Sequence, residues 1–63
     1  LLATADDGLA MWRVDPDGSV HRTLDGRKWQ QAGSVGAAEA IAASRNSAFI
    51  VTAAGVQRLH HEG

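Results

Sequence analysis

The sequence predicts an all-β chain of antiparallel strands, and three observations support this fold class. Short runs of β-branched, aromatic and small apolar residues alternate with turn signals, most clearly in Ala48-Phe49-Ile50-Val51-Thr52-Ala53. The tetrapeptide Asp15-Pro16-Asp17-Gly18 suits a type I turn followed by a residue in the left-handed region, which closes a β-hairpin. Similar segments also recur along the chain, as in proteins built from stacked or radial repeats.

The turn signals divide the chain into seven expected strands. These lie near residues 1–5, 9–14, 19–24, 29–33, 36–43, 48–53 and 56–60. In the second strand Ala10, Trp12 and Val14 share one face and Leu9 and Met11 share the other, so we expect both faces to be buried. The fourth strand is polar enough to lie at a sheet edge.

Residues 35–44 fit two structures. Alanine is the best helix former, so residues 37–43 favour a helix on propensity alone, and the alternative fold class is a small α+β domain with a helix near 36–44. Ile41 is the only large apolar residue there, so a helix would have little surface to bury. Small alanines also suit a crowded inner strand, and we predict a strand.

Length and composition exclude several classes of function. A chain of 63 residues buries only about 60% of the surface that its unfolded form exposes, and without cysteine it has no disulfide to compensate. We therefore expect it to pack against partners. The net charge of −1 gives no basic surplus for nucleic acid, and no apolar run is long enough to cross a membrane.

The stretch from Thr23 to Trp29 carries the clearest motif. Thr23 and Asp25 can hydrogen-bond backbone groups within a turn, Gly26 can supply a positive φ, and Trp29 can pin the hairpin through its large ring. The four residues resemble the Asp-box, or BNR repeat, of sialidase-like β-propellers, in its shorter form S-x-D-G-x-x-W with Thr23 in place of Ser. The resemblance implies a structural turn between the third and fourth strands of a propeller blade, away from any active site.

An internal repeat extends this resemblance. Val20 aligns with Val56 and Arg22 with Arg58, both at an offset of 36 residues, and residues 9–14 match 48–53 in character. We expect residues 1–33 to form a first blade and 34–63 a second, incomplete blade with a degenerate box. Because propellers have 4–8 blades, just under two blades imply either a ring of several copies or a piece of a longer propeller, and the opening on two leucines favours a piece.

Few residues are candidates for binding or chemistry. His60, His61 and Glu62 are the only cluster of potential ligands, but adjacent strand residues point to opposite faces, so we expect no metal site and no cofactor. Trp12 could stack on a sugar, although its apolar neighbours favour the core. The six basic residues are scattered, and we expect them to be solvated.

The expected function is a non-catalytic propeller segment that serves as scaffold or interaction surface. Sialidases of the resembled family use a tyrosine nucleophile, and this chain has no tyrosine, so their activity does not carry over. The alternative is part of a glycoside hydrolase or carbohydrate-binding propeller whose functional residues lie elsewhere. Expected partners are other copies or the rest of a longer propeller, with carbohydrate as the ligand class considered. The resemblance implies an extracytoplasmic or secreted protein, with a cytoplasmic one as the alternative.

Overall fold

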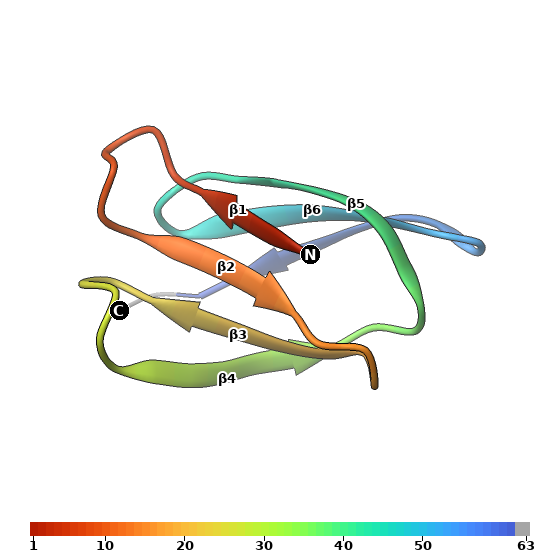
Figure 1. Ribbon diagram of the computed structural model, residues 1–63. Coiled ribbons are helices and arrows are strands. Elements are labelled where there is room, and N and C mark those ends of the chain that lie inside the picture. The colour runs from red at the N-terminus through yellow and green to blue at the C-terminus, as the bar shows by residue number, and fades with distance from the viewer. Residues whose placement is uncertain (62–63) are drawn as a thin grey trace.

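The computed structural model describes residues 1–61, which form seven strands in two antiparallel sheets and contain no helix (Figure 1). The first sheet contains, in spatial order, β1 (Leu2–Thr4), β2 (Met11–Val14), β3 (Ser19–Thr23) and β4 (Trp29–Ser34). The second sheet contains β5 (Ala38–Ala43), β6 (Ser47–Thr52) and β7 (Gly55–His60). Within each sheet consecutive strands pair, so each sheet is a meander, and the predicted all-β class is confirmed.

The alanine-rich segment is a strand, and the α+β alternative is wrong. β5 pairs with β6 from Ala38 to Ala43 with one register shift, and Ile41 and Ala43 on its inner face pack against the core. Tertiary packing overrides helix propensity here, because the small side chains let β5 lie close to the first sheet, where β1 and β2 contact it.

The turn at residues 15–18 closes the β2–β3 hairpin as the sequence predicts. The Gly18 N–H donates to the Asp15 carbonyl at 2.9 Å, and Gly18 has a φ of 89°. The Gly18 carbonyl then accepts a hydrogen bond of 2.8 Å from the Val35 N–H, which ties the hairpin to the end of β4. A Cβ atom at position 18 would lie 3.1 Å from the Val35 carbonyl oxygen, so the close approach also requires glycine.

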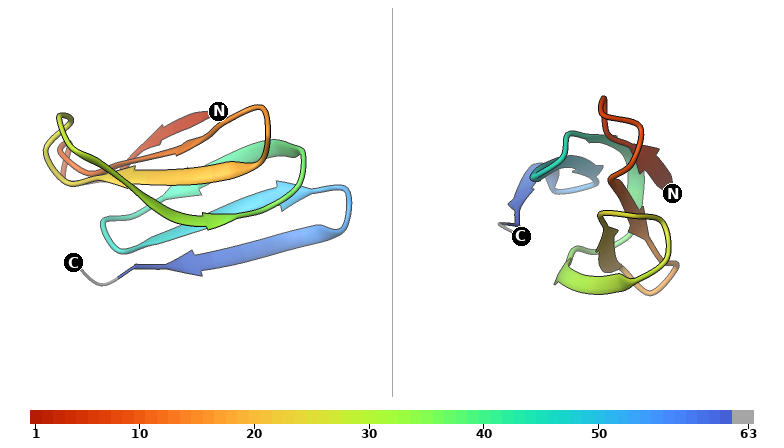
Figure 2. Two further views of the ribbon diagram at one scale, coloured as in Figure 1. Left: turned by 90° about the horizontal axis from the view of Figure 1, so that it is seen from below. Right: turned by 90° about the vertical axis from the view of Figure 1, so that its left-hand side faces the viewer.

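The core lies between the two sheets, which face each other with their strands running in similar directions (Figure 2). Its buried members come from β2, β3, β6 and the segment after β4, and are Trp12, Val14, Val20, Val35, Ala48 and Ile50. The prediction for residues 9–14 holds for one face only. Ala10, Trp12 and Val14 are buried, whereas Leu9 is exposed and Met11 half-buried, because the second sheet covers only the inner face of the first.

Candidate functional site

The turn between β3 and β4 is held from within by the Thr23 hydroxyl. This oxygen accepts hydrogen bonds from the Gly26 N–H at 2.9 Å and from the Asp25 N–H at 3.4 Å. The hydroxyl donates to Asp25 Oδ1 at 3.2 Å. Thr23 is almost fully buried because it pairs with Met11 on one side and with Trp29 on the other. All the described hydrogen bonds of its hydroxyl are therefore made within the turn.

The Asp25 carboxylate completes the turn from the solvent side. Asp25 Oδ1 accepts hydrogen bonds from the Arg27 N–H at 2.8 Å and the Lys28 N–H at 3.1 Å. These two bonds, with a smaller contribution from Thr23, lower the pKa of Asp25 below its usual value, because they favour the ionised form. Gly26 takes the required positive φ of 81°. Asp25 Oδ1 is therefore used within the turn.

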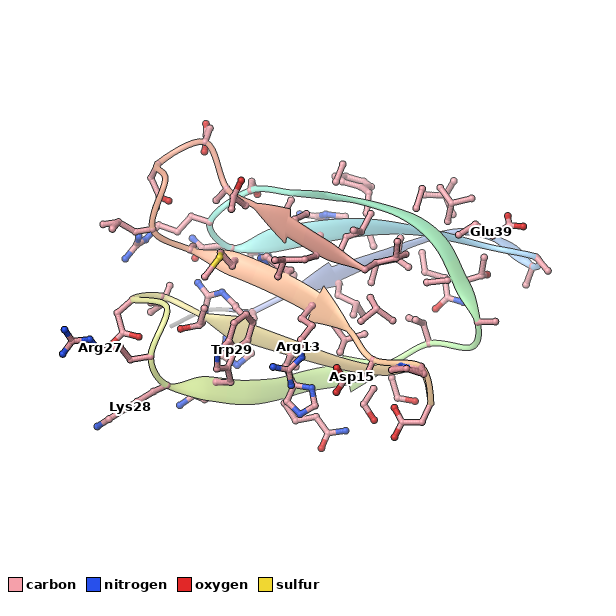
Figure 3. The ribbon with its side chains drawn as sticks, viewed as in Figure 1. Arg13, Asp15, Arg27, Lys28, Trp29 and Glu39 are labelled. Atoms are coloured by element: carbon pink, nitrogen blue, oxygen red, sulfur yellow. The ribbon has the colours of Figure 1, made fainter. Side chains whose placement is uncertain are left out.

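Trp29 lies half-buried on the outer face of the first sheet, under a guanidinium group. The Arg13 Cζ is 4.6 Å from the centre of the Trp29 ring, a distance typical of a cation–π contact. Arg13 Nε also donates to Asp15 Oδ1 at 2.7 Å, so Asp15, Arg13 and Trp29 form a short line along this face (Figure 3). His21 Nδ1 lies 3.3 Å from Asp15 Oδ2 without hydrogen-bond geometry, so it is a neighbour of this line and not a further link in it.

A second turn, between β1 and β2, lies where the expected strands at 1–5 and 9–14 put it, but its use of the same hydrogen bonding was not predicted from the sequence. Asp7 Oδ1 accepts hydrogen bonds from the Leu9 N–H at 2.9 Å and the Ala10 N–H at 3.0 Å, and Gly8 has a φ of 76°. These bonds, with Arg45 Nη1 at 2.6 Å from Asp7 Oδ2, lower the pKa of Asp7 to about 2. The signal was present, since an Asp-Gly pair follows a strand and precedes Met11 at the spacing that separates Asp25-Gly26 from Trp29.

Arg22 joins the two sheets, which corrects the expectation that the basic residues are solvated. Its side chain is buried, and Nε and Nη2 donate to the Arg45 carbonyl at 2.9 and 2.7 Å. Nη2 also donates to Asn46 Oδ1 at 2.9 Å, and Nη1 lies 2.8 Å from His61 Nδ1. Burial lowers the pKa of Arg22, but an arginine remains charged at neutral pH. Valine and arginine alternating in one strand gave no sign of this role.

The residues considered as ligand contacts are used elsewhere in the fold. Trp12 is fully buried and its Nε1–H donates to the Ser44 carbonyl at 3.0 Å, which leaves the ring no exposed face on which a sugar could stack. His60 Nδ1 lies 3.1 Å from Ser47 Oγ, and His61 bonds Arg22. Glu62 lies outside the described residues. In residues 1–61 no three His, Asp or Glu side chains are grouped so that they could hold a metal ion.

One open depression borders the β3–β4 turn. It has a volume of about 190 Å³ and is lined by Arg22, Leu24, Asp25, Lys28 and Gln30. Ligand pockets usually have volumes of about 300–1,000 Å³. The Arg22 guanidinium and Asp25 Oδ1 make their hydrogen bonds within the protein, and the depression is smaller than this range.

The comparisons with known proteins identified no relative. Protein-family models, curated proteins and solved structures were each searched with this chain, and none of the three searches gave a match. Within residues 1–61 there is also no helix long and apolar enough to cross a membrane.

Proposed function

We propose that the chain is a non-catalytic segment of an Asp-box β-propeller and serves as a structural scaffold and interaction surface. The observation that carries this proposal is the internal use of the motif. The Thr23 hydroxyl and the Asp25 carboxylate together accept hydrogen bonds from four backbone N–H groups, those of residues 25, 26, 27 and 28. Groups engaged in this way hold a turn and are not available as nucleophile or general base.

The position of the turn supports the same proposal. It connects β3 and β4, the last two strands of a four-stranded antiparallel meander, which is where the resembled repeat has its turn. The second sheet packs face to face on the first, as neighbouring blades do in a radial repeat. Polar side chains also bond from one sheet to the other: Trp12 Nε1 and the Arg22 guanidinium donate to the backbone of the β5–β6 turn, and Asp7 accepts from Arg45. These bonds help to fix the orientation of the two sheets.

Two measurements on the 63-residue chain test the proposal. We expect Asp25→Ala to lower the melting temperature while the matched Asp6→Ala change in the neighbouring β1–β2 turn leaves it nearly unchanged, because no described hydrogen bond uses the Asp6 carboxylate. We also expect no reproducible binding on a glycan array. Sugar binding that Asp25→Ala abolishes without a loss of stability would contradict the scaffold role and favour a carbohydrate-binding propeller.

A further inference from the structure

The strand register shows that the two sheets repeat one pattern. An alanine, an aromatic residue and an arginine lie side by side across the first three strands of each sheet. In the first sheet these are Ala3, Trp12 and Arg22, and in the second they are Ala42, Phe49 and Arg58. Two valine pairs follow in the same positions, Val14 opposite Val20 and Val51 opposite Val56. The match therefore extends over five positions, beyond the two identities visible in the sequence.

The matched positions lie on corresponding faces that differ in exposure. In the first sheet this face is the buried one, with Trp12 and Val20 fully covered and Arg22 only 3% exposed, because the second sheet packs on it. In the second sheet Phe49 is 49% exposed and Val56 66%, and Arg58 is exposed too. We call this surface, made of Phe49, Val51, Val56 and Arg58, the front face of the second sheet.

Further large exposed hydrophobic residues lie in the first sheet, in or beside β1. Leu1, Leu2 and Leu9 are 50–60% exposed and belong to β1 or the segments beside it. Leu2 pairs with Arg13, so it lies on the outer face of the first sheet, opposite the buried Trp12 face. Both end surfaces of the two-sheet stack thus carry exposed hydrophobic side chains, Phe49 and Val56 on one and Leu2 on the other, whereas Leu1 pairs with Val14 and belongs to the inner face of the first sheet. Head-to-tail contact between copies would cover both surfaces at once.

We propose that the front face of the second sheet is a docking surface for a second copy of this chain, which presents the outer face of its first sheet and its β1–β2 turn. This inference rests on the proposed scaffold role and assigns its interaction surface. Arg22 shows how such a contact is made, since its guanidinium reaches the turn at Arg45 and Asn46 between the first two strands of the sheet that it faces. The corresponding turn of the first sheet lies between β1 and β2.

Charge complementarity supports this partner. The β1–β2 turn contains Asp6 and Asp7, and Asp6 is exposed. Repeating the relation between the two sheets brings the Arg58 guanidinium of one copy to the acidic turn of the next. Arginine would then meet a carboxylate where Arg22 meets a backbone carbonyl and an amide oxygen, a stronger class of hydrogen bond. The contact is heterologous, so each copy uses its front face and its turn with two different neighbours.

Sedimentation equilibrium of the full chain tests the proposal. We expect the average mass to rise above the 6.6 kDa of one chain as its concentration approaches about 1 mM, where a contact with a dissociation constant of that size is substantially populated. Val56→Lys should raise the dissociation constant at least tenfold, because it places a charge on the apolar part of the front face. Ala37→Lys adds the same charge at an exposed site in the segment that connects β4 to β5 and should leave association unchanged. Far-UV circular dichroism of each variant checks that the β fold is kept.

A charge-swap pair identifies the docking partner. Arg58→Glu and Asp6→Lys should each weaken association, and an equimolar mixture of the two should restore it, because the swapped side chains meet across one interface. A chain that stays at 6.6 kDa at about 1 mM, or equal association of Val56→Lys and Ala37→Lys, would overturn the proposal. A monomeric chain without glycan binding leaves the scaffold role standing, whereas glycan binding counts against that role and does not change the mass measurement.

Discussion

Replacing Arg22 by methionine tests whether the two sheets are held together by a polar contact as well as by the core. Methionine keeps much of the apolar stem and removes all four hydrogen bonds of the guanidinium. Each such bond contributes about 1 kcal/mol net, but water can replace the guanidinium at the exposed Arg45 and Asn46. We therefore expect a loss of about 2–3 kcal/mol in the free energy of unfolding.

A loss of this size is large for so short a chain. At about 0.05–0.15 kcal/mol per residue, 63 residues give a total stability of roughly 3–9 kcal/mol. The melting temperature should fall by roughly 10–20 °C, since 1 kcal/mol corresponds to about 4–8 °C in a domain of this size. The melting temperature of Arg22→Lys should lie between those of wild type and Arg22→Met, because lysine keeps the charge but lacks the planar set of guanidinium donors.

The assay is urea unfolding at low protein concentration, followed by tryptophan fluorescence. Arg58→Met is the matched control, because Arg58 holds the corresponding position on the exposed face of the second sheet, and we expect it to change stability by less than about 0.5 kcal/mol. Combining Arg22→Met with Asn46→Ala should cost less than the sum of the single changes, since both remove the same bond. Equal effects of Arg22→Met and Arg58→Met would refute the idea that Arg22 joins the sheets.

Three further predictions concern the turns. Thr23→Val keeps the shape of the side chain but leaves the Gly26 N–H without its partner, and should lower the free energy of unfolding by about 1–3 kcal/mol in a urea titration. Gly18→Ala should lower the melting temperature because of its positive φ and the nearby Val35 carbonyl, whereas Gly36→Ala, with open space around it, should not. The pKa of Asp7 is lowered on folding from 3.8 to about 2, so the unfolded chain binds more protons in that range. Stability should then fall as the pH drops from about 4 to about 2, and Asp7→Asn should flatten this part of the pH profile of the melting temperature.

Much of the fold could be predicted because its signals are local. The hairpin at residues 15–18 depends on proline and glycine within one tetrapeptide, and all seven strands lie within a few residues of where the alternation and the turn signals put them. The structure of the alanine-rich β5 was harder to predict. Helix propensity is a local property of its alanines, whereas the strand depends on the sheet that packs against it. The hydrogen bonds of Thr23 and Asp25 could be anticipated for the same reason as the hairpin, because every partner lies within three residues.

The contacts between the sheets could not be read from the sequence, because their partners lie far along the chain. Arg22 and Arg58 follow the same alternation with valine in equivalent strands, yet one is buried and bonded to a turn more than 20 residues away and the other is exposed. Their difference is not a property of either strand. It depends on whether another sheet packs against the face that carries the arginine. The second sheet packs against the Arg22 face, and no described residue packs a further sheet against the Arg58 face. The same difference makes the arginine pair informative, since a side chain that is exposed in the second copy of a repeat and buried in the first marks the face where the next sheet is expected.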